Sequence, residues 1–316
     1  MQTYFPHASR LIYGCMGLGG GWNNAPVSTS DTQQAQDVIE KVLDLGINVF
    51  DHADIYTFGK AETVFGEVLK SSPSLKDKMI IQSKCAIRFE DQQGPKRYDF
   101  SAKHIQTSVE GILERLNIDQ LDILLLHRPD PLMELEEVAG TIRLLQQQGK
   151  IQHIGVSNMH GHQIAFLQSA LDTPIIANQL EMSLGFREWV EDAITTNSAA
   201  NRNNGYAPGT VEHCSMNNVQ LQAWGSLAQG RYTGAKVTTK EDRATAQLVS
   251  QLASEYQTSP EAIVIAWLMK HPAAIAPVLG STNIKRIEAS YRAVDVNLTR
   301  EHWYRLFESA RGQEMP

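Results

Sequence analysis

Eight short apolar runs alternate with longer segments of helical periodicity, and this order constrains the fold more than any other feature of the sequence. The apolar runs cover residues 11–16, 48–51, 79–85, 122–127, 151–157, 175–179, 220–224 and 275–279. Apolar residues recur every three or four positions, as in a helix that covers a sheet, at residues 32–45, 102–116 and 135–148. Helix N-caps are expected at Asp31, Ser101 and Ser259.

The strands themselves indicate a parallel sheet that is covered on both sides. Residues 123–126 are Ile-Leu-Leu-Leu, and an exposed antiparallel sheet would not tolerate a strand that is apolar on both faces. Eight repeats of strand and helix predict a (β/α)8 TIM barrel, an α/β fold, with a doubly wound open sheet as the rival because both contain the βαβ unit. Barrels often use a chain of 316 residues for one domain, so we expect a single domain over residues 1–316.

Charge and cysteine usage exclude several classes of partner. The formal charge of -7 provides no broad cationic surface, so neither nucleic acid nor an anionic membrane is expected to bind. Cys15, Cys85 and Cys214 are too few and too scattered for a disulfide framework or a cysteine metal site, so we expect plain thiols and no metal.

A signal-peptide pattern and a membrane-spanning apolar stretch are both absent from the sequence, which favours a soluble cytoplasmic protein.

Polar side chains at the ends of consecutive strands form the candidate site. These side chains are Asp51 at the end of the second run, Tyr56 just beyond it, Lys84 in the third run and His127 at the end of the fourth. The active site of a barrel forms at the carboxyl ends of its strands, so the four side chains should lie over one cavity. Each alone has a structural explanation, as a loop cap, a packed ring, a snorkelling lysine or a core histidine. Their shared position favours a function.

The combination suits proton transfer to an oxygen. A phenol with a pKa of about 10 is a weak acid at neutral pH, and a nearby cation such as Lys84 would lower that pKa. Asp51 could pair with the buried lysine and keep it charged, while His127 could donate a hydrogen bond to a substrate oxygen. The set is typical of a carbonyl reductase, in which an acid protonates a developing alkoxide.

Other chemistries lack their signatures. The sequence contains no GxSxG elbow, no HExxH, no Walker loop GxxxxGK(S/T) and no paired cysteines for zinc. The GLGGG stretch at residues 17–21 leaves a dinucleotide-fold interpretation open, although Trp22 and an Asn-Asn-Ala-Pro segment follow where a phosphate-binding helix should start. The favoured interpretation is a barrel loop near a cofactor, beginning at Gly17.

These residues resemble the aldo-keto reductases, and the likeness extends over essentially the whole chain. DHADIY at residues 51–56, followed by Gly59 and Glu62, resembles the signature around that family's catalytic aspartate and tyrosine. LLLHRP at residues 124–129 resembles its fourth-strand histidine motif, and GKI followed by IGVSN at residues 154–158 resembles its fifth-strand motif. The family commonly has threonine where His52 stands, and this difference could change the pocket.

The resemblance implies hydride transfer from a reduced nicotinamide to a carbonyl carbon. Tyr56 would protonate the oxygen with help from Lys84 and Asp51, and His127 would orient the carbonyl. The corresponding nicotinamide contacts are Ser157, Asn158 and Gln179 for the carboxamide and Trp224 for the face of the ring.

Two later segments resemble the family's phosphate sites. WGSLAQG at residues 224–230 resembles the seventh-strand loop whose backbone amides approach the pyrophosphate. GSTNIKR at residues 280–286 resembles the segment that holds the adenosine 2′-phosphate at a helix N-terminus, which implies NADP(H) rather than NAD. The residues implied in these segments are Gly225, Ser226, Leu227, Gly280, Ser281 and Thr282, with Arg286 as the guanidinium clamp.

The substrate stays open at this stage. Candidate walls of a pocket for a small carbonyl substrate are Trp22, Phe58, Arg88 and Arg128. Residues 197–208, rich in Asn, Ala and Gly, are expected to form a loop before the seventh strand. The sequence does not distinguish aldehydes from ketones, and it leaves the direction of the reaction and the oligomeric state open. Two alternative functions remain, a nucleotide-sensing regulatory subunit with little turnover and an NAD-dependent enzyme that oxidises an alcohol.

Overall fold

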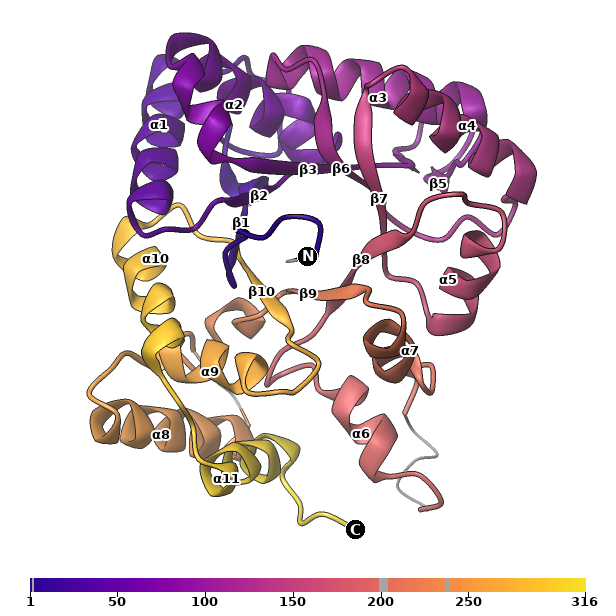
Figure 1. The fold of residues 1–316 in the computed structure, drawn as a ribbon. Helices are drawn as coiled ribbons and strands as arrows, with labels where there is room; N and C mark the ends of the chain where they lie inside the picture. The colour runs from indigo at the N-terminus through magenta and orange to yellow at the C-terminus, as the bar shows by residue number, and fades with distance from the viewer. Residues whose placement is uncertain (2, 199–203, 237–238) are drawn as a thin grey trace. The chain divides into compact units, whose positions relative to one another are not determined.

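The computed structural model describes the chain except for residue 2 and residues 199–203 and 237–238. Eight strands form a closed parallel barrel in the order β1-β10-β9-β8-β7-β6-β3-β2 (Figure 1). Their bounds are β1 Ile12–Gly14, β2 Val49–Asp51, β3 Ile80–Cys85, β6 Leu121–Leu126, β7 Ile151–Ser157, β8 Ile175–Glu181, β9 Gln220–Trp224 and β10 Ala276–Leu279. The predicted (β/α)8 barrel is therefore confirmed, and the open-sheet alternative is wrong. Residues 199–203 of the predicted loop at 197–208 lie outside the described residues.

Helices follow the strands along the chain, as the periodicity predicted. Their bounds are α1 Thr29–Asp44, α2 Lys60–Ser71, α3 Ala102–Leu116, α4 Leu135–Gln147, α5 Gly161–Gln168, α6 Glu188–Ile194, α7 Thr210–Met216, α8 Lys240–Glu255, α9 Pro260–Met269, α10 Ile284–Tyr291 and α11 Arg300–Arg311. In Figure 1, α1, α2, α3 and α4 lie on the outer side of β2, β3 and β6. Two further strands, β4 (Ile87–Arg88) and β5 (Arg97–Tyr98), pair antiparallel and form a hairpin after β3.

The chain divides into two compact units. The first comprises Met1–Asn178 and Gly280–Thr282, and the second comprises Gln179–Leu279 and Asn283–Pro316. In the first unit every residue of β3 is buried, and β3 pairs in parallel with β2 and β6. Burial on both faces explains why β6 is nearly all apolar rather than alternating, whereas β3 buries the polar residues Gln82, Ser83 and Lys84 toward its end. The single domain expected over residues 1–316 stays a prediction.

The second unit has an aromatic core between α9 and α11. The rings of Trp267 and Trp303 stack with centroids 5.0 Å apart, and each indole N–H donates to the other residue's backbone carbonyl, at 3.1 and 3.0 Å. Trp189 of α6 meets Trp267 edge to face at 5.6 Å. The reciprocal hydrogen bonds allow both indoles to pack in the core without an unsatisfied N–H group.

Helix capping matches two of the three predicted positions. Ser101 and Ser259 accept hydrogen bonds from the backbone at the starts of α3 and α9, which confirms them as N-caps. Asp31 is wrong as an N-cap, because Ser28 caps α1. The Ser28 hydroxyl accepts from the Asp31 N–H at 3.2 Å, and the Asp31 carboxylate accepts from the Ser28 N–H at 2.9 Å. This capping box satisfies two backbone donors at once and starts the helix earlier than the apolar spacing predicted.

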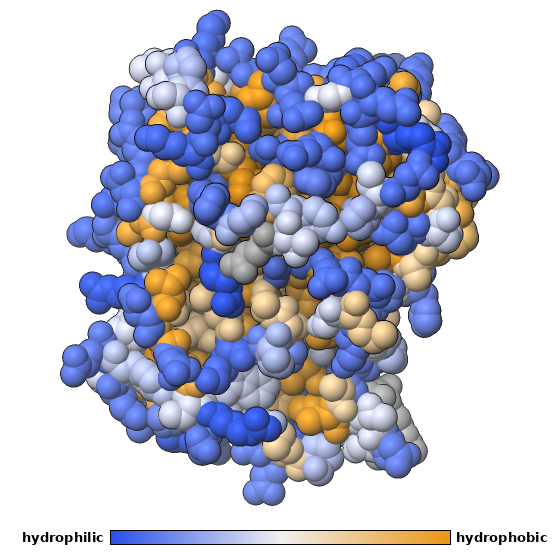
Figure 2. All heavy atoms as spheres, in the orientation of Figure 1, coloured by the Kyte–Doolittle hydropathy of each residue, from blue (hydrophilic) through white to orange (hydrophobic). Residues whose placement is uncertain are grey.

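Polar and charged side chains cover most of the face shown in Figure 2, with smaller apolar areas between them. Near the N-terminus, Tyr4 and Phe5 pack against His153 of β7, with ring centroids 5.1 and 5.3 Å apart. Among the described helices, none is long and apolar enough to cross a bilayer.

The close approach of α2 to α3 generates a stability prediction. A Cβ atom on Gly66 of α2 would lie 2.0 Å from the backbone oxygen of Arg115, whereas a Cβ on Gly140 of α4 would meet nothing within 4 Å. Gly66→Ala should therefore lower the free energy of unfolding by about 1–3 kcal/mol, because the helices must move apart. The matched control Gly140→Ala should raise it by about 0.5–1 kcal/mol, because alanine is the better helix former. Urea unfolding measures both, and equal effects would contradict the packing described.

Candidate active site

A buried ammonium group joins the predicted catalytic residues of the first unit. Lys84 Nζ lies 2.7 Å from the Asp51 carboxylate and 3.0 Å from the Tyr56 hydroxyl, and it donates to the backbone carbonyl of His52 at 2.9 Å. The Lys84 side chain is fully buried and Asp51 almost so. The structure therefore brings together three residues that the sequence placed at the ends of neighbouring strands.

The parallel pairing of β2 with β3 produces this arrangement. Asp51, the last residue of β2, is in register with Gln82 of β3, and Gln82 Nε2 donates to Asp51 Oδ1 at 2.6 Å. Side chains two positions apart on a strand point to the same side, so Gln82 and Lys84 both reach the aspartate. Gln82 was not among the predicted site residues, although its period-two spacing from Lys84 is a signal that could have found it.

Tyr56 begins a short 3-10 turn, Tyr56–Gly59, just beyond β2. Burial raises its pKa, the charge of Lys84 lowers it, and the charge of Asp51 raises it again, so that the pKa lies above the ordinary value of 10.0. The lowering by Lys84 agrees with the sequence analysis, but burial outweighs it. Burial also lowers the pKa of Lys84, yet the charges of Asp51 and Tyr56 raise it more. At neutral pH the Tyr56 side chain is therefore a neutral phenol beside the Lys84 ammonium and the Asp51 carboxylate.

His127 comes directly after β6 and faces the tyrosine. The two rings are 6.1 Å apart between centroids and nearly perpendicular. Burial, followed by the positive charges of Lys84, Arg128 and Lys96, lowers the pKa of His127 to about 2, so the imidazole is neutral. Its Nδ1 atom is buried and has no hydrogen-bond partner among the described residues. A neutral imidazole has one N–H to donate, which suits contact with a carbonyl oxygen.

The predicted nicotinamide contacts of the first unit lie beside this histidine. Asn158 Nδ2 donates to the His127 carbonyl at 3.1 Å and to Ser157 Oγ at 2.8 Å, and Asn158 has a left-handed backbone with φ of 59°. At another strand end, a Cβ on Gly17 would lie 3.1 Å from Thr282 Cγ2, so these two predicted residues are neighbours. The carbonyl of Ser281, which follows Gly280, accepts from the Tyr13 hydroxyl at 3.1 Å.

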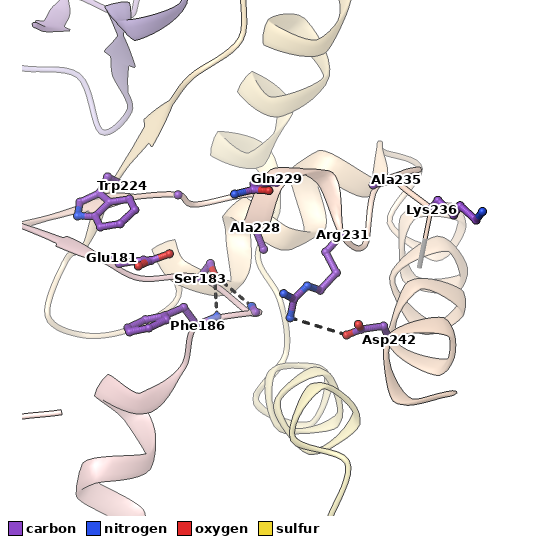
Figure 3. A pocket seen from close by; sticks show the side chains of 12 residues that line it. Glu181, Ser183, Phe186, Trp224, Ala228, Gln229, Arg231, Ala235, Lys236 and Asp242 are labelled. Carbon is purple, nitrogen blue, oxygen red and sulfur yellow. Dashed lines mark hydrogen bonds and ion pairs between the residues drawn. The ribbon is translucent and has the colours of Figure 1, made fainter. Parts of the chain in front are cut away.

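The second unit contains a cavity of about 420 Å³ at the ends of β8 and β9 (Figure 3). Its lining residues are Glu181, Ser183, Gly185, Phe186, Trp224, Gly225, Ala228, Gln229, Arg231, Ala235, Lys236 and Asp242. The predicted Trp224 and Gly225 are among them, whereas Arg231 and Lys236 were missed because sequence spacing does not connect them to a phosphate. Arg231 lies 4.0 Å from Asp242, and its guanidinium extends toward that carboxylate in Figure 3.

The loop after β9 is held in an unusual backbone conformation. Ala228 and Gln229 both have left-handed φ angles, 48° and 56°, which non-glycine residues seldom adopt. Ser226, in the same loop, donates to the Val278 carbonyl at 2.8 Å. In the strands below the loop, the side-chain amide of Gln179 in β8 donates to the Gln222 side chain of β9 at 3.0 Å. Leu227 is the residue that precedes the strained pair. Such outliers gather where a ligand is held.

Arg286, the predicted phosphate clamp, lies in the first turn of α10. A Cβ on Gly230 would be 3.2 Å from Arg286 Nη2, so the guanidinium reaches the loop after β9. The Arg286 backbone N–H donates to the Asn283 side chain, which caps the helix. Within the described parts of the chain the guanidinium makes no hydrogen bond or ion pair, which leaves its donors available for an anion.

The geometry can be compared with known proteins. The sequence profile described as the aldo/keto reductase family matches residues 10–310. The chain belongs to this family. It is similar to the 6-dehydroglucose reductase of Agrobacterium fabrum, with 34% identity over 97% of this chain and 96% of that one. It is also similar to the oxidoreductase YdhF of Escherichia coli, with 35% identity over 98% and 96%.

A solved structure shows the same fold. The crystal structure of a thermostable aldo-keto reductase in complex with the inhibitor epalrestat superposes with a TM-score of 0.75 over 95% of each chain, at 21% identity. Together with the family match, these relatives show that the protein is an oxidoreductase. They support a carbonyl reductase role for this aldo-keto reductase, which acts on small carbonyl compounds with a nicotinamide cofactor.

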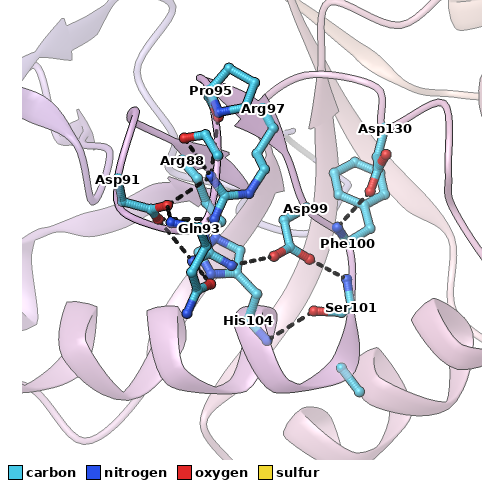
Figure 4. Close-up of polar contacts among 12 residues, drawn as sticks. Arg88, Asp91, Gln93, Pro95, Arg97, Asp99, Phe100, Ser101, His104 and Asp130 are labelled. Carbon is cyan, nitrogen blue, oxygen red and sulfur yellow. Dashed lines mark hydrogen bonds and ion pairs between the residues drawn. The ribbon is translucent and has the colours of Figure 1, made fainter.

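The candidate pocket walls of this aldo-keto reductase differ in their surroundings. Trp22 and Phe58 are in ring contact, with centroids 5.5 Å apart. The Arg88 guanidinium lies 2.9 Å from Asp99 and 3.1 Å from Asp91, so it is occupied by ion pairs (Figure 4). Arg128 is half-buried and follows His127 directly. Among the residues described, no group of three His, Cys, Asp or Glu side chains could hold a metal ion.

A second buried polar group adjoins Ser83, the residue before Lys84; the sequence pattern included Glu62 and Asp54 but did not predict their contact with Arg115. Glu62 of α2 is fully buried, accepts from Ser83 Oγ at 2.5 Å and pairs with Arg115 of α3 at 2.8 Å. Asp54 lies nearby, and its Oδ1 atom is buried without a hydrogen-bond partner among the described residues. Burial and the negative charge of Glu62 raise the pKa of Asp54 to about 7. One arginine therefore lies near two carboxyl groups, and the second keeps its proton at pH values below about 7.

This proton generates a pH prediction. The pKa of Asp54 is about 7 in the folded chain against an ordinary value of 3.8, so between these values the unfolded chain releases a proton that the folded chain keeps. The contribution of Asp54 to the free energy of unfolding therefore falls as pH rises from about 4 to about 7. Asparagine does not titrate, so the Asp54→Asn variant lacks this loss. The free energy of unfolding of the variant minus that of the original protein should therefore increase by on the order of 2–4 kcal/mol as pH rises across this range.

Urea unfolding at several pH values measures the difference. The control is Asp44→Asn, at an exposed carboxyl group that ends α1. This control shows how much of any change comes from removal of a surface carboxyl group. A pH dependence for Asp54→Asn no larger than that of the control would show that Asp54 is ionised throughout.

Proposed function

We propose that this protein is an NADPH-dependent reductase of aldehydes or ketones in which Tyr56 is the general acid. The observation that carries the proposal is the contact between Tyr56 and Lys84, 3.0 Å from hydroxyl to ammonium, with Asp51 at 2.7 Å on the ammonium. A phenol in this position is protonated at neutral pH, and the anion left after proton transfer lies beside a fixed positive charge.

Three other side chains complete the acid. Asp51 keeps Lys84 charged despite its burial, because an opposite charge outweighs the loss of water. Gln82 donates a second hydrogen bond to the Asp51 carboxylate, at Oδ1, and helps to fix its orientation. His127 is neutral and nearly perpendicular to the tyrosine ring, so it can donate a hydrogen bond to the same carbonyl oxygen that Tyr56 protonates. The two donors would orient the substrate carbonyl and stabilise the alkoxide.

The residues of the chain fit a nicotinamide dinucleotide. When bound, the reduced nicotinamide supplies the hydride for the carbonyl carbon. Ser157, Asn158 and Gln179 would bind the carboxamide, and Trp224 would stack on the ring, by correspondence with the family. The cavity beside Trp224 and the strained loop at residues 225–230 support this assignment, because close approach of backbone to pyrophosphate needs such a loop.

Preference for the phosphorylated cofactor rests on Arg286. Its guanidinium extends beside Gly230 without a protein partner among the described residues, and a planar guanidinium matches a phosphate group in geometry. Gly280, Ser281 and Thr282 would supply further contacts, as the family pattern implies. For the substrate, two relatives at 34% and 32% identity are named 6-dehydroglucose reductase, which makes an aldehyde of a sugar a candidate.

Replacement of Tyr56 tests the acid. Tyr56→Phe should lower turnover of any carbonyl substrate by about 100- to 10,000-fold, because the proton donor is lost. The affinity for NADPH should change less than about twofold, since the ring remains. Absorbance decay of NADPH measures turnover, and fluorescence titration measures binding. Tyr98→Phe, at an exposed tyrosine of β5, is the control. Unchanged turnover in Tyr56→Phe would remove the proposed mechanism, and NADPH binding without turnover in the original protein would favour a regulatory subunit.

Replacement of Arg286 tests the cofactor preference. Arg286→Ala should weaken NADPH binding by about 10- to 100-fold, the strength of charge-assisted hydrogen bonds, and leave NADH binding unchanged. Arg305→Ala removes another exposed arginine, on α11, and should change neither. Equal weakening of both cofactors by Arg286→Ala would show that this residue does not bind the 2′-phosphate.

A further inference from the structure

Three aromatic side chains of the first unit form an exposed cluster that neither the acid nor the cofactor contacts use. Trp22, Phe58 and Phe89 are 48%, 48% and 40% exposed. The ring of Phe58 lies between the other two, with centroids 5.5 Å from Trp22 and 5.4 Å from Phe89. They come from the segments that follow β1, β2 and β3. Large apolar side chains gathered at the surface usually mark a binding site.

The backbone at the centre of this cluster is strained. Thr57 and Phe58 have left-handed φ angles of 47° and 59°, a conformation that bulky and β-branched residues rarely adopt. The Thr57 hydroxyl donates to the Leu18 carbonyl at 3.1 Å, which ties this turn to the loop that carries Trp22. Strain of this kind persists where it serves binding or catalysis, and here its effect is to project Phe58 outward two residues after the catalytic tyrosine.

Polar contacts hold the loop of Trp22. Lys60, at the start of α2, donates to the Gly21 carbonyl at 2.8 Å and to Asn23 Oδ1 at 3.1 Å. A Cβ on Gly19 would lie 2.6 Å from the Lys60 backbone, so the loop and the helix are in close contact. The indole is therefore positioned before any ligand arrives.

The β4–β5 hairpin holds Phe89 from the other side. Arg88 bonds to Asp99 and Asp91, and Arg97 bonds to Asp91 at 2.9 Å, so that ion pairs span the hairpin (Figure 4). Arg88 therefore braces the segment of Phe89. This placement explains why an arginine predicted as a pocket wall has its guanidinium engaged by carboxylates.

The cluster lies close to the reacting groups along the chain. Phe58 is two residues from Tyr56, which is within about 7 Å between Cα atoms. Phe89 is five residues beyond Lys84, and Lys84 contacts the Tyr56 hydroxyl at 3.0 Å. Phe58 is therefore near a substrate whose carbonyl oxygen contacts Tyr56, and its ring contacts bring Trp22 and Phe89 to the same place.

We propose that Trp22, Phe58 and Phe89 bind a ring of the substrate, and that the enzyme prefers carbonyl compounds whose carbonyl group is attached to a ring over open-chain ones. Aromatic side chains bind the apolar C–H face of a saturated ring, including that of a sugar, and the face or edge of an aromatic ring. A flexible alkyl chain has no such face and loses more conformational freedom on binding. This proposal rests on the reductase function proposed above.

Matched aldehydes test the proposal. NADPH oxidation is measured with cyclohexanecarbaldehyde and with heptanal, which have the same number of carbon atoms. The original protein should show a kcat/KM that is about tenfold higher for the cyclic aldehyde. Phe58→Ala and Phe89→Ala should each lower kcat/KM for the cyclic aldehyde about five- to tenfold by raising its KM. The kcat for either aldehyde and the affinity for NADPH should stay within about twofold of the original values. Phe89→Tyr keeps the ring and should retain the preference.

The control is Phe166→Ala, which removes a phenylalanine of α5 that is 54% exposed and should leave the preference unchanged. Thermal unfolding shows whether each variant is folded. Benzaldehyde distinguishes an aromatic ring from a saturated one. A kcat/KM for benzaldehyde above that for cyclohexanecarbaldehyde indicates an aromatic substrate, and a lower kcat/KM indicates a saturated ring. Turnover without preference for a ring, or equal losses for both aldehydes in the folded variants, overturns the aromatic site alone. No turnover of any carbonyl compound contradicts the reductase function as well.

Discussion

The ion pair between Lys84 and Asp51 is the interaction on which the candidate active site depends. A fully buried ammonium group is unfavourable unless a charge and hydrogen bonds replace its water, and Asp51 at 2.7 Å supplies both. Loss of one partner of such a pair typically costs about 3–5 kcal/mol. The pair connects the ends of β2 and β3, and the Tyr56 hydroxyl completes the lysine's contacts. The stability of these strand ends and the proposed proton transfer therefore involve the same three side chains.

Unfavourable features of the chain gather at the carboxyl ends of the strands. Non-glycine residues with left-handed φ angles follow β2, β3, β7 and β9, and these include Thr57, Phe58, Ala86, Asn158, Ala228 and Gln229. Buried polar atoms without partners among the described residues are found there too, on Asp54 and on His127. The barrel strands that carry these ends are mostly buried and pair in parallel. Their packing offsets the strain, which explains how the ends of the strands can be shaped for binding.

Much of the fold and of the site could be predicted from the sequence, because both follow from local patterns. Apolar runs of strand length predicted all eight barrel strands to within a few residues. The position of polar residues after those runs predicted that Asp51, Tyr56, Lys84 and His127 lie together, and the structure shows contacts among them. The N-cap of α1 was misplaced because Ser28 precedes Ala35, the first apolar residue of the helix, by about two turns. Glu62 and Arg115 could not be paired from the sequence, since 53 residues separate them.

The sequence by itself determined the order of strands and helices and which reactive side chains stand at the strand ends, because hydrophobic periodicity and residue type are local properties. Only the tertiary structure decided the charge states. Tyr56 keeps its proton because burial outweighs Lys84, the pKa of Asp54 rises to about 7 because the carboxyl group is buried and lies beside Glu62, and His127 is neutral because it is buried near cations. A pKa depends on desolvation and on charges from elements distant in sequence, and these exist only once the chain has folded.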